Sequence, residues 1–179
     1  MSKNVLIISS SPRKGGNSDV LCDQFAKGAV ESGNTVEKIF LKEKKIAYCN
    51  GCGACFSGDK CPLKDDADEI VEKMIAADVI VMATPVYFYT MCAQMKTLID
   101  RTCARYMDIA DKEFYFIMTA ADPERLSLTR TLECFRGFTA CLPGAEEKGV
   151  VYGTGVTNIG EVENTKAMYQ AYEMGKTIN

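Results

Sequence analysis

The sequence contains no histidine, no long apolar run and no excess of positive charge, and each absence argues against a class of function. Without histidine, the chain lacks the commonest general base and the commonest transition-metal ligand. A net charge of −3 at pH 7 gives no electrostatic basis for binding nucleic acid or an anionic membrane. No apolar stretch approaches the roughly 18 residues that a membrane helix needs. Chemistry must therefore come from thiolates, carboxylates, Lys, Tyr or a bound cofactor.

Two further absences concern location and crosslinking. The first apolar run, from Val5 to Ile8, is too short for the core of a signal peptide, so we expect a cytoplasmic protein. The nine cysteines are an odd number, which argues against a disulfide scaffold in such a protein. The sequence has no internal repeat, low-complexity tract or linker. Its 179 residues are expected to form a single domain, 1–179, with a cysteine-rich insertion at 47–66.

Predicted strands and helices alternate along the chain. Apolar or β-rich runs predict strands at 4–9, 35–41, 78–83, 113–120 and 149–153. Helical spacing and end signals predict helices at 19–32, 68–77, 93–106, 123–140 and 161–176. The nearly continuous apolar strands indicate burial on both faces, and hence a parallel sheet between two layers of helices. The sequence therefore predicts a three-layer α/β/α sandwich, and five strands favour the order 2-1-3-4-5.

The motif SSPRKGGNSD, which follows Ser9 at the end of the first strand, has the composition of an anion site. In such sheets, ligands bind beyond the carboxyl ends of the strands, and the N-terminus of a helix favours phosphate. The glycines match neither a Walker A loop nor a dinucleotide fingerprint, so a mononucleotide phosphate fits better. The alternative is a Ser- and Gly-rich turn that caps a helix. The side chains available to an anion are Ser9, Ser11, Arg13, Asn17 and Ser18.

An apolar and aromatic cluster follows the third strand at the same edge of the predicted sheet. Because exposure of such a cluster is costly, a flat apolar ring could cover it. The alternative is that the aromatic rings pack on a neighbouring helix or subunit. Thr119, at the end of the fourth strand, is expected to face the same edge. The residues of the cluster are Pro85, Val86, Tyr87, Phe88 and Tyr89.

The segment CNGCGACFSGDKCP, 49–62, has the spacing Cys-x2-Cys-x2-Cys-x5-Cys-Pro. Thiolates this close together can converge on one metal centre. Zinc is one alternative, although its sites usually place two cysteine pairs farther apart. Metal-free thiols and redox-active thiols beside a cofactor are others. The remaining cysteines lack partner spacing and are expected to be small core residues, namely Cys22, Cys92, Cys103, Cys134 and Cys141.

A run of acidic residues follows the last cysteine of this segment. Asp65, Asp66, Asp68 and Glu69 could form a carboxylate site. The simpler interpretation is that they open the next helix, where negative charge is favoured by the helix dipole.

Together, SSPRKGGNSD and ATPVYFYTMCAQMKTLIDR (83–101) resemble the FMN-binding, NAD(P)H-dependent reductases of the flavodoxin-like superfamily. The resemblance extends from the first strand to the last helix and implies a flavodoxin-like fold. It also implies a homo-oligomer, commonly a dimer. FMN phosphate would bind at Ser9, Ser11, Arg13, Asn17 and Ser18. The isoalloxazine ring would lie against Pro85, Val86, Tyr87 and Phe88, with Thr119 beside it.

The cysteine spacing resembles that of iron–sulfur flavoproteins in the same superfamily, which implies a [4Fe–4S] cluster on Cys49, Cys52, Cys55 and Cys61. We therefore expect an FMN-dependent NAD(P)H oxidoreductase that passes electrons to a small molecule or a redox protein. The chemistry would occur at N5 of FMN and needs no side-chain acid or base. One alternative is an electron carrier that uses FMN and the cluster without direct turnover of NAD(P)H. Another is a mononucleotide-binding regulatory module. No nucleic-acid or membrane partner is expected.

Overall fold

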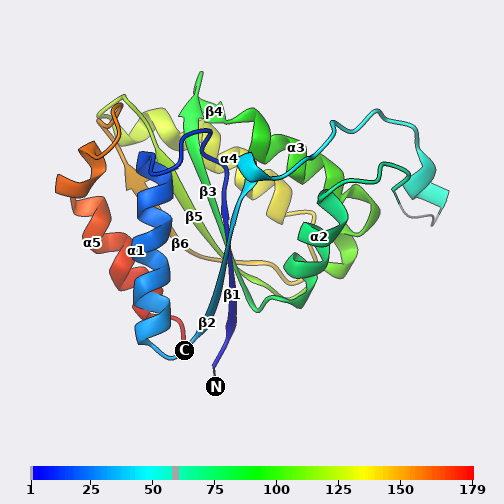
Figure 1. Ribbon diagram of the computed structural model, residues 1–179, viewed down its shortest axis with the longest axis horizontal. Helices are drawn as coiled ribbons and strands as arrows, with labels where there is room; N and C mark the ends of the chain where they lie inside the picture. The colour runs from blue at the N-terminus through cyan, green and yellow to red at the C-terminus, as the bar shows by residue number, and fades with distance from the viewer. Residues whose placement is uncertain (1, 58–60) are drawn as a thin grey trace.

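The computed structural model describes residues 2–57 and 61–179, in which a twisted sheet lies between two layers of helices (Figure 1). The strands are β1 (Asn4–Ser9), β2 (Thr35–Phe40), β3 (Val79–Tyr87), β4 (Thr90–Met91), β5 (Glu113–Thr119) and β6 (Glu146–Gly153). The α-helices are α1 (Asn17–Glu31), α2 (Ala67–Ala76), α3 (Ala93–Arg101), α4 (Thr129–Thr139) and α5 (Lys166–Lys176). Helices α1 and α5 cover one face of the sheet, and α2, α3 and α4 cover the other.

The main sheet has the strand order β2-β1-β3-β5-β6, and every pair along this path is parallel. This confirms the predicted order, because β5 and β6 are the fourth and fifth of the predicted strands. The additional strand β4 pairs antiparallel with the end of β3 and forms a short hairpin that the sequence analysis did not anticipate.

Alternation of side chains along the strands supplies both halves of the core. In β1, Leu6 and Ile8 face α2, α3 and α4, whereas Val5 and Ile7 face α1 and α5. The strand is therefore apolar on both faces, as expected for a parallel sheet between helices. The half of the core between the sheet and helices α2, α3 and α4 also contains stacked aromatic rings. The ring centroids of Phe116 in β5 and Phe135 in α4 are 4.8 Å apart.

The predicted element boundaries differ from the structure where charge or a turn interrupts the apolar pattern. Strand β6 begins at Glu146, before the predicted start at residue 149. It is an edge strand, and its first residues are charged and exposed, so they lack the apolar pattern that predicts a strand. Its pairing with β5 shifts register between Phe114 and Tyr115. Strand β3 continues to Tyr87, past Pro85, because its end pairs with β4. Helix α3 ends at Arg101, and short 3-10 turns occupy 102–104 and 106–108.

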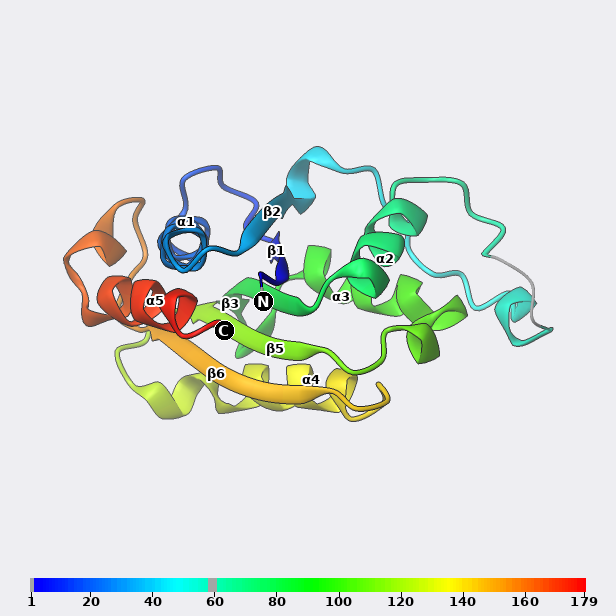
Figure 2. The ribbon, with the colours of Figure 1, turned by 90° about the horizontal axis from the view of Figure 1, so that it is seen from below.

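The topology leaves the β1–α1 loop and the β3–β4 hairpin at one edge of the sheet, where the carboxyl ends of the strands meet (Figure 1). The segment between β2 and α2, which carries four cysteines, extends away from this edge past α2 and α3. From below, it lies at the end of the molecule opposite α1 and α5 (Figure 2). Among the described residues, no helix is both long enough and apolar enough to cross a membrane.

Candidate functional site

The β1–α1 loop is held in a tight turn at the N-terminus of α1. The Ser10 backbone N–H and hydroxyl both donate to the carbonyl oxygen of Ala83 in β3, at 3.0 and 2.7 Å. The Ser11 hydroxyl accepts from the N–H of Arg13 at 3.1 Å and donates to its carbonyl at 2.9 Å. Gly15 turns the chain with a φ of +67°, a left-handed conformation that favours glycine. The first N–H groups of α1 have no acceptor within the helix, so the loop surrounds a set of available donors.

Ser18, in the first turn of α1, carries the clearest sign of a missing partner. The residue is only 1% exposed, and its hydroxyl has no hydrogen-bond partner among residues 2–57 and 61–179. Leaving a buried hydroxyl unpaired costs about 1–3 kcal/mol. An anion at this helix terminus would accept both this hydroxyl and the neighbouring N–H groups, and it would also interact favourably with the helix dipole.

The structure brings all five predicted anion-binding residues to this loop, but four of them, including Ser11, already have partners. The Ser9 hydroxyl donates to Asp19 at 2.8 Å, and the Asn17 side-chain oxygen accepts from the N–H of Val162 at 3.3 Å. Arg13 is exposed, and its guanidinium donates to the carbonyl of Thr157 at 3.0 Å, which links the loop to the segment after β6. Of these five, Ser18 therefore has the only side chain without a partner among the described residues, whereas Ser11 lines the turn with its hydroxyl paired and Arg13 lies at the rim.

The sequence gives no sign of a half-buried ion pair that lies beneath the loop, between Asp19 and Lys38. Asp19 is 4% exposed and accepts from Ser9, from the N–H of Gly15 at 2.9 Å and from Lys38 at 2.7 Å. Lys38 lies on β2, so only the pairing of β2 with β1 brings it under α1. Burial acts to raise the pKa of Asp19, but the hydrogen bonds from Lys38, Gly15 and Ser9 outweigh it and hold the pKa below its usual range.

The low pKa of Asp19 predicts a stability that depends on acid pH. A carboxyl whose pKa is lower in the folded state contributes stability that is fully present above about pH 5 and is lost as the pH falls through that pKa. We expect Asp19→Asn to lower the free energy of unfolding at pH 7 by about 1–3 kcal/mol. We also expect the variant to lose less stability than the wild type between pH 5 and pH 3. Urea unfolding across this range measures both, and parallel curves would contradict the assignment.

The β3–β4 hairpin presents aromatic side chains at the same edge. Its turn residues Phe88 and Tyr89 have φ values of +49° and +64°, which suits a two-residue hairpin turn but is unfavourable for bulky side chains. Phe88 is 98% exposed. Pro85 of β3 pairs in register with Thr119, which is buried at the end of β5. The hairpin therefore combines backbone strain with apolar exposure, and a ligand or a second subunit would offset part of that cost.

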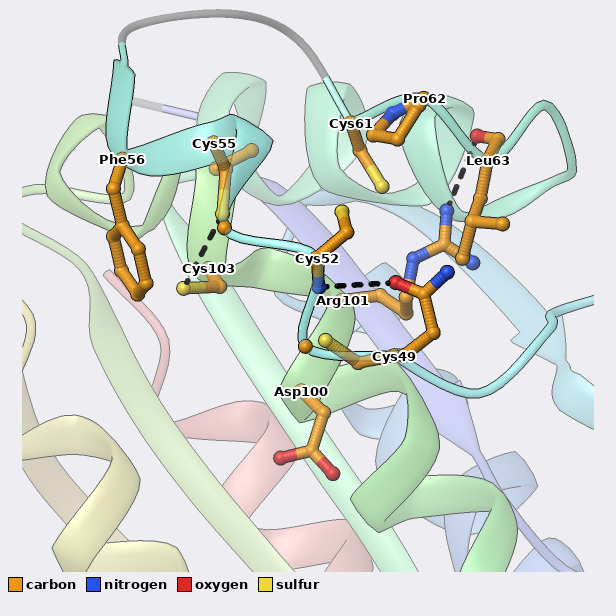
Figure 3. Close-up of a pocket in the computed structure, with 14 residues that line it drawn as sticks. Cys49, Cys52, Cys55, Phe56, Cys61, Pro62, Leu63, Asp100, Arg101 and Cys103 are labelled. Carbon is orange, nitrogen blue, oxygen red and sulfur yellow. Dashed lines mark hydrogen bonds between the residues drawn. The ribbon is translucent and has the colours of Figure 1, made fainter.

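Five thiols line one pocket in the segment between β2 and α2 and its surroundings (Figure 3). Four are the predicted metal ligands, Cys49, Cys52, Cys55 and Cys61. The fifth is Cys103, from the 3-10 turn after α3, and its Sγ lies 3.9 Å from the Sγ of Cys55. We call this the cysteine pocket.

The prediction that the other five cysteines are core residues is only partly correct. Cys22 and Cys92 are buried, but Cys103 is half-buried and both Cys134 and Cys141 are exposed. Cys134 lies on the face of α4 away from its buried residues, whereas Cys103 and Cys141 lie in the turns that follow α3 and α4.

The donor set of the cysteine pocket suits a thiolate-bound metal centre. Gly51 and Gly53 have φ values of +66° and +75° and let the backbone turn between successive cysteines. Across the described ranges 2–57 and 61–179, no three cysteine or acidic side chains are close enough together to hold a metal ion. The loop would therefore have to draw its thiols inward around a metal. Residues 58–60, between Cys55 and Cys61, lie outside the described residues.

The two ends of the cysteine segment meet at Arg101, the last residue of α3. Its guanidinium Nη1 donates to the Ala47 carbonyl at 2.9 Å and to Asp65 at 2.6 Å, and Nη2 donates to the Leu63 carbonyl at 3.3 Å. Asp65 also accepts from the N–H groups of Ala47 and Ala67. Asp65 thus opens α2, as the acidic run predicted, and also closes the base of the segment.

Burial acts to raise the pKa of Asp65, but hydrogen bonds from Arg101, Ala47 and Ala67 hold it below its usual range. Burial likewise acts to lower the pKa of Arg101, whereas Asp65 and the neighbouring Cys61 raise it. Both groups are therefore charged at neutral pH.

Comparison with known proteins agrees with the fold. An iron–sulfur flavoprotein of Archaeoglobus fulgidus is 44% identical over 94 residues, which are 52% of this chain and 43% of that protein. A Bacillus subtilis protein named as an NAD(P)H-dependent FMN-containing oxidoreductase, YwqN, is 26% identical over 160 residues, 84% of each chain. This chain matches about half the length of the curated iron–sulfur flavoproteins.

Among solved structures, the NAD(P)H:quinone oxidoreductase of Methanothermobacter marburgensis superposes with a TM-score of 0.77. The superposition covers 98% of this chain and 96% of that chain at 18% identity, and it confirms the flavodoxin-like fold. The family model of the NADPH-dependent FMN reductases matches residues 3–132, which include the β1–α1 loop, the cysteine pocket and the β3–β4 hairpin. The chain therefore belongs to the NADPH-dependent FMN reductase family.

Proposed function

We propose that this protein is an FMN-dependent NAD(P)H oxidoreductase whose β1–α1 loop binds the phosphate of FMN. The observation that carries the proposal is the buried, unpaired hydroxyl of Ser18 beside the free N–H groups of α1. Ser11 lines the same turn, and Arg13 at the rim adds a cation that can exchange its contact with Thr157 for a phosphate oxygen. Membership of the FMN reductase family supports the identity of the ligand.

The flavin ring would lie at the β3–β4 hairpin. Pro85, Val86, Tyr87 and Phe88 would contact it, and Thr119 is in register with Pro85 at the same edge. Bound FMN would accept a hydride from NAD(P)H at N5 and release electrons to a small molecule or a redox protein. The side chains position the ring and exclude water, and none of them has to transfer a proton. Because Phe88 is almost fully exposed, we further propose that a second subunit completes this surface in a homo-oligomer.

Ser18→Ala tests the phosphate site without disturbing the apoprotein. Removing an unpaired buried hydroxyl should leave the stability of the apoprotein unchanged or slightly raised, since no hydrogen bond is lost. FMN affinity should fall about 10- to 100-fold, because a bond to a charged acceptor is worth roughly 1.5–3 kcal/mol. Titration of apoprotein with FMN, followed by flavin fluorescence, measures the affinity. Ser32→Ala, at the other end of α1, is the control for FMN affinity only, because its hydroxyl donates to the Lys176 carbonyl at 2.9 Å and its loss also affects stability.

The same preparation separates the oxidoreductase from a simple carrier. Under anaerobic conditions, NADH or NADPH should bleach the flavin absorption of the wild-type protein within seconds. Normal FMN affinity in Ser18→Ala would contradict the site. Bound FMN that neither nucleotide reduces would contradict the enzymatic activity while leaving the site intact.

The cysteine pocket favours a second candidate function, an electron carrier that contains FMN and a [4Fe–4S] cluster. Cys49, Cys52, Cys55 and Cys61 would hold the cluster, and their spacing and shared pocket support this set. The names of several relatives support it as well. A cluster at this position would supply one-electron transfer. The two candidates are compatible if FMN receives a pair of electrons and the cluster passes them on singly.

A further inference from the structure

We propose that Arg101 is a positioning residue for the cysteine pocket, where its Nε–H donates a hydrogen bond to sulfur and raises the reduction potential of the bound group. The inference rests on the proposed cluster at Cys49, Cys52, Cys55 and Cys61. It adds a residue from α3, outside the cysteine motif.

The contacts of Arg101 leave one of its three nitrogens without a hydrogen bond among the described residues. Two of its three nitrogens are committed to Ala47, Leu63 and Asp65, which hold the guanidinium in a fixed orientation. The third, Nε, is buried and has no hydrogen-bond partner in the part of the chain that the structure describes. The side chain is only 1% exposed, so water does not readily take the place of a partner.

The unpaired nitrogen belongs to a residue that lines the cysteine pocket. Arg101, Cys52 and Cys61 all line it, and Figure 3 shows the guanidinium between Leu63 and these two cysteines. A guanidinium has donors only, so its unpaired N–H calls for an acceptor. Sulfur is the acceptor that this pocket would provide, either as a cysteine thiolate or as a sulfide of the cluster.

The charges around the pocket determine whether the reduction potential rises or falls. A cluster on four thiolates is anionic, and reduction adds a further negative charge. A cation and N–H donor beside the sulfurs stabilise the reduced form more than the oxidised form, which raises the potential. Asp65 and Asp100 are carboxylates at or near the pocket and act in the opposite direction. Removing Arg101 should therefore lower the potential, and neutralising Asp65 should raise it.

The opposite changes in reduction potential expected for the Arg101 and Asp65 variants distinguish a direct effect of Arg101 on the sulfurs from a purely structural role. Arg101→Gln and Asp65→Asn break the same ion pair and loosen the same loop base. If Arg101 only closed the loop, both variants would change the pocket in the same way. If it acts on sulfur, their potentials move in opposite directions. Arg101→Lys keeps the charge but loses the fixed Nε–H, and it should lie between Arg101→Gln and the wild type.

The experiment uses the full chain with FMN bound, reconstituted anaerobically with ferrous iron and sulfide. Iron content, visible spectra and a potentiometric titration followed by electron paramagnetic resonance are recorded for the wild type and the three variants. We expect Arg101→Gln to disfavour reduction about tenfold, which is 59 mV for one electron, and Asp65→Asn to favour it. If Arg101→Gln does not fold, Arg101→Lys below the wild type and Asp65→Asn above it give the same answer.

Potentials that do not move, or that move in one direction in all variants while iron content stays normal, would overturn the role of Arg101 and leave the cluster in place. A wild-type protein that takes up no iron would overturn both the cluster and this inference. Iron content therefore distinguishes the two failures.

Discussion

Gly28→Ala and Gly175→Ala are each expected to destabilise the protein by at least about 2 kcal/mol, because the two glycines form the crossing point of α1 and α5. A Cβ on Gly28 would lie 2.1 Å from the carbonyl oxygen of Tyr172, and one on Gly175 would lie 2.1 Å from that of Phe25. Both obstacles are backbone atoms, so no rotamer change relieves the overlap, and overpacking of this kind costs typically 1–3 kcal/mol or more. The gain of about 1 kcal/mol from replacing glycine in a helix does not compensate.

The matched control is Gly137→Ala in α4. No described atom lies within 4 Å of a Cβ at this position, so the same substitution brings only the helix-propensity gain. Gly137→Ala should stabilise the protein by about 0.5–1 kcal/mol. Urea unfolding of the apoproteins at pH 7 compares the three variants. A shift of the same sign at Gly28 and Gly137 would show that α1 and α5 do not approach as closely as the structure has them.

The consequences of this crossing extend to the proposed FMN site. Helix α1 carries Ser18 at its N-terminus and Gly28 near its C-terminus, so its packing on α5 fixes the axis along which its free N–H groups point. The backbone N–H of Val162, in the 3-10 turn that precedes α5, also donates to Asn17 at the start of α1. A loss of FMN affinity in Gly28→Ala would therefore report on helix position rather than on a direct contact.

The general fold could be predicted because it depends on local patterns. Continuous apolar strands that alternate with amphipathic helices define a parallel sheet between helices, and the number of strands favours one order. The charged start of β6 could not be predicted, since Glu146 and Glu147 resemble a loop until the edge of the sheet is known. The β3–β4 hairpin was also missed, because Pro85 signals the end of a strand more often than its continuation.

The sequence indicated which segments form the candidate sites, but not which side chains from other parts of the chain contact them. The β1–α1 loop was located correctly because the first strand must end there. The ion pair of Asp19 with Lys38 depends on the register between β1 and β2, which has no sequence signal. Arg101 and Cys103 reach the cysteine pocket from α3 and the turn after it, far along the chain from the motif. Their contribution follows from the packing of α3 beside the cysteine segment, and spacing rules cannot detect it.

Cys52→Ser and Cys61→Ser are expected to abolish the stoichiometric iron of the anaerobically reconstituted protein. The wild type should contain about four iron atoms per chain, as a [4Fe–4S] cluster requires. Each variant removes one of four thiolate ligands, and serine is a poor replacement because iron–sulfur clusters are held by soft thiolates. Iron and sulfide assays measure the loss directly. Cys134→Ser, at an exposed position on α4 outside the pocket, should keep the full iron content.

Two further variants decide which thiol completes the ligand set. The Sγ atoms of Cys55 and Cys103 are 3.9 Å apart, so Cys103, which lies outside the motif, is a second candidate for the ligand position assigned to Cys55. If the motif determines the ligands, Cys55→Ser loses iron and Cys103→Ser keeps it, whereas the reverse result assigns the fourth position to Cys103. About one zinc ion per chain in place of iron would identify a structural zinc site. Wild-type protein with neither metal would show that the pocket holds only thiols.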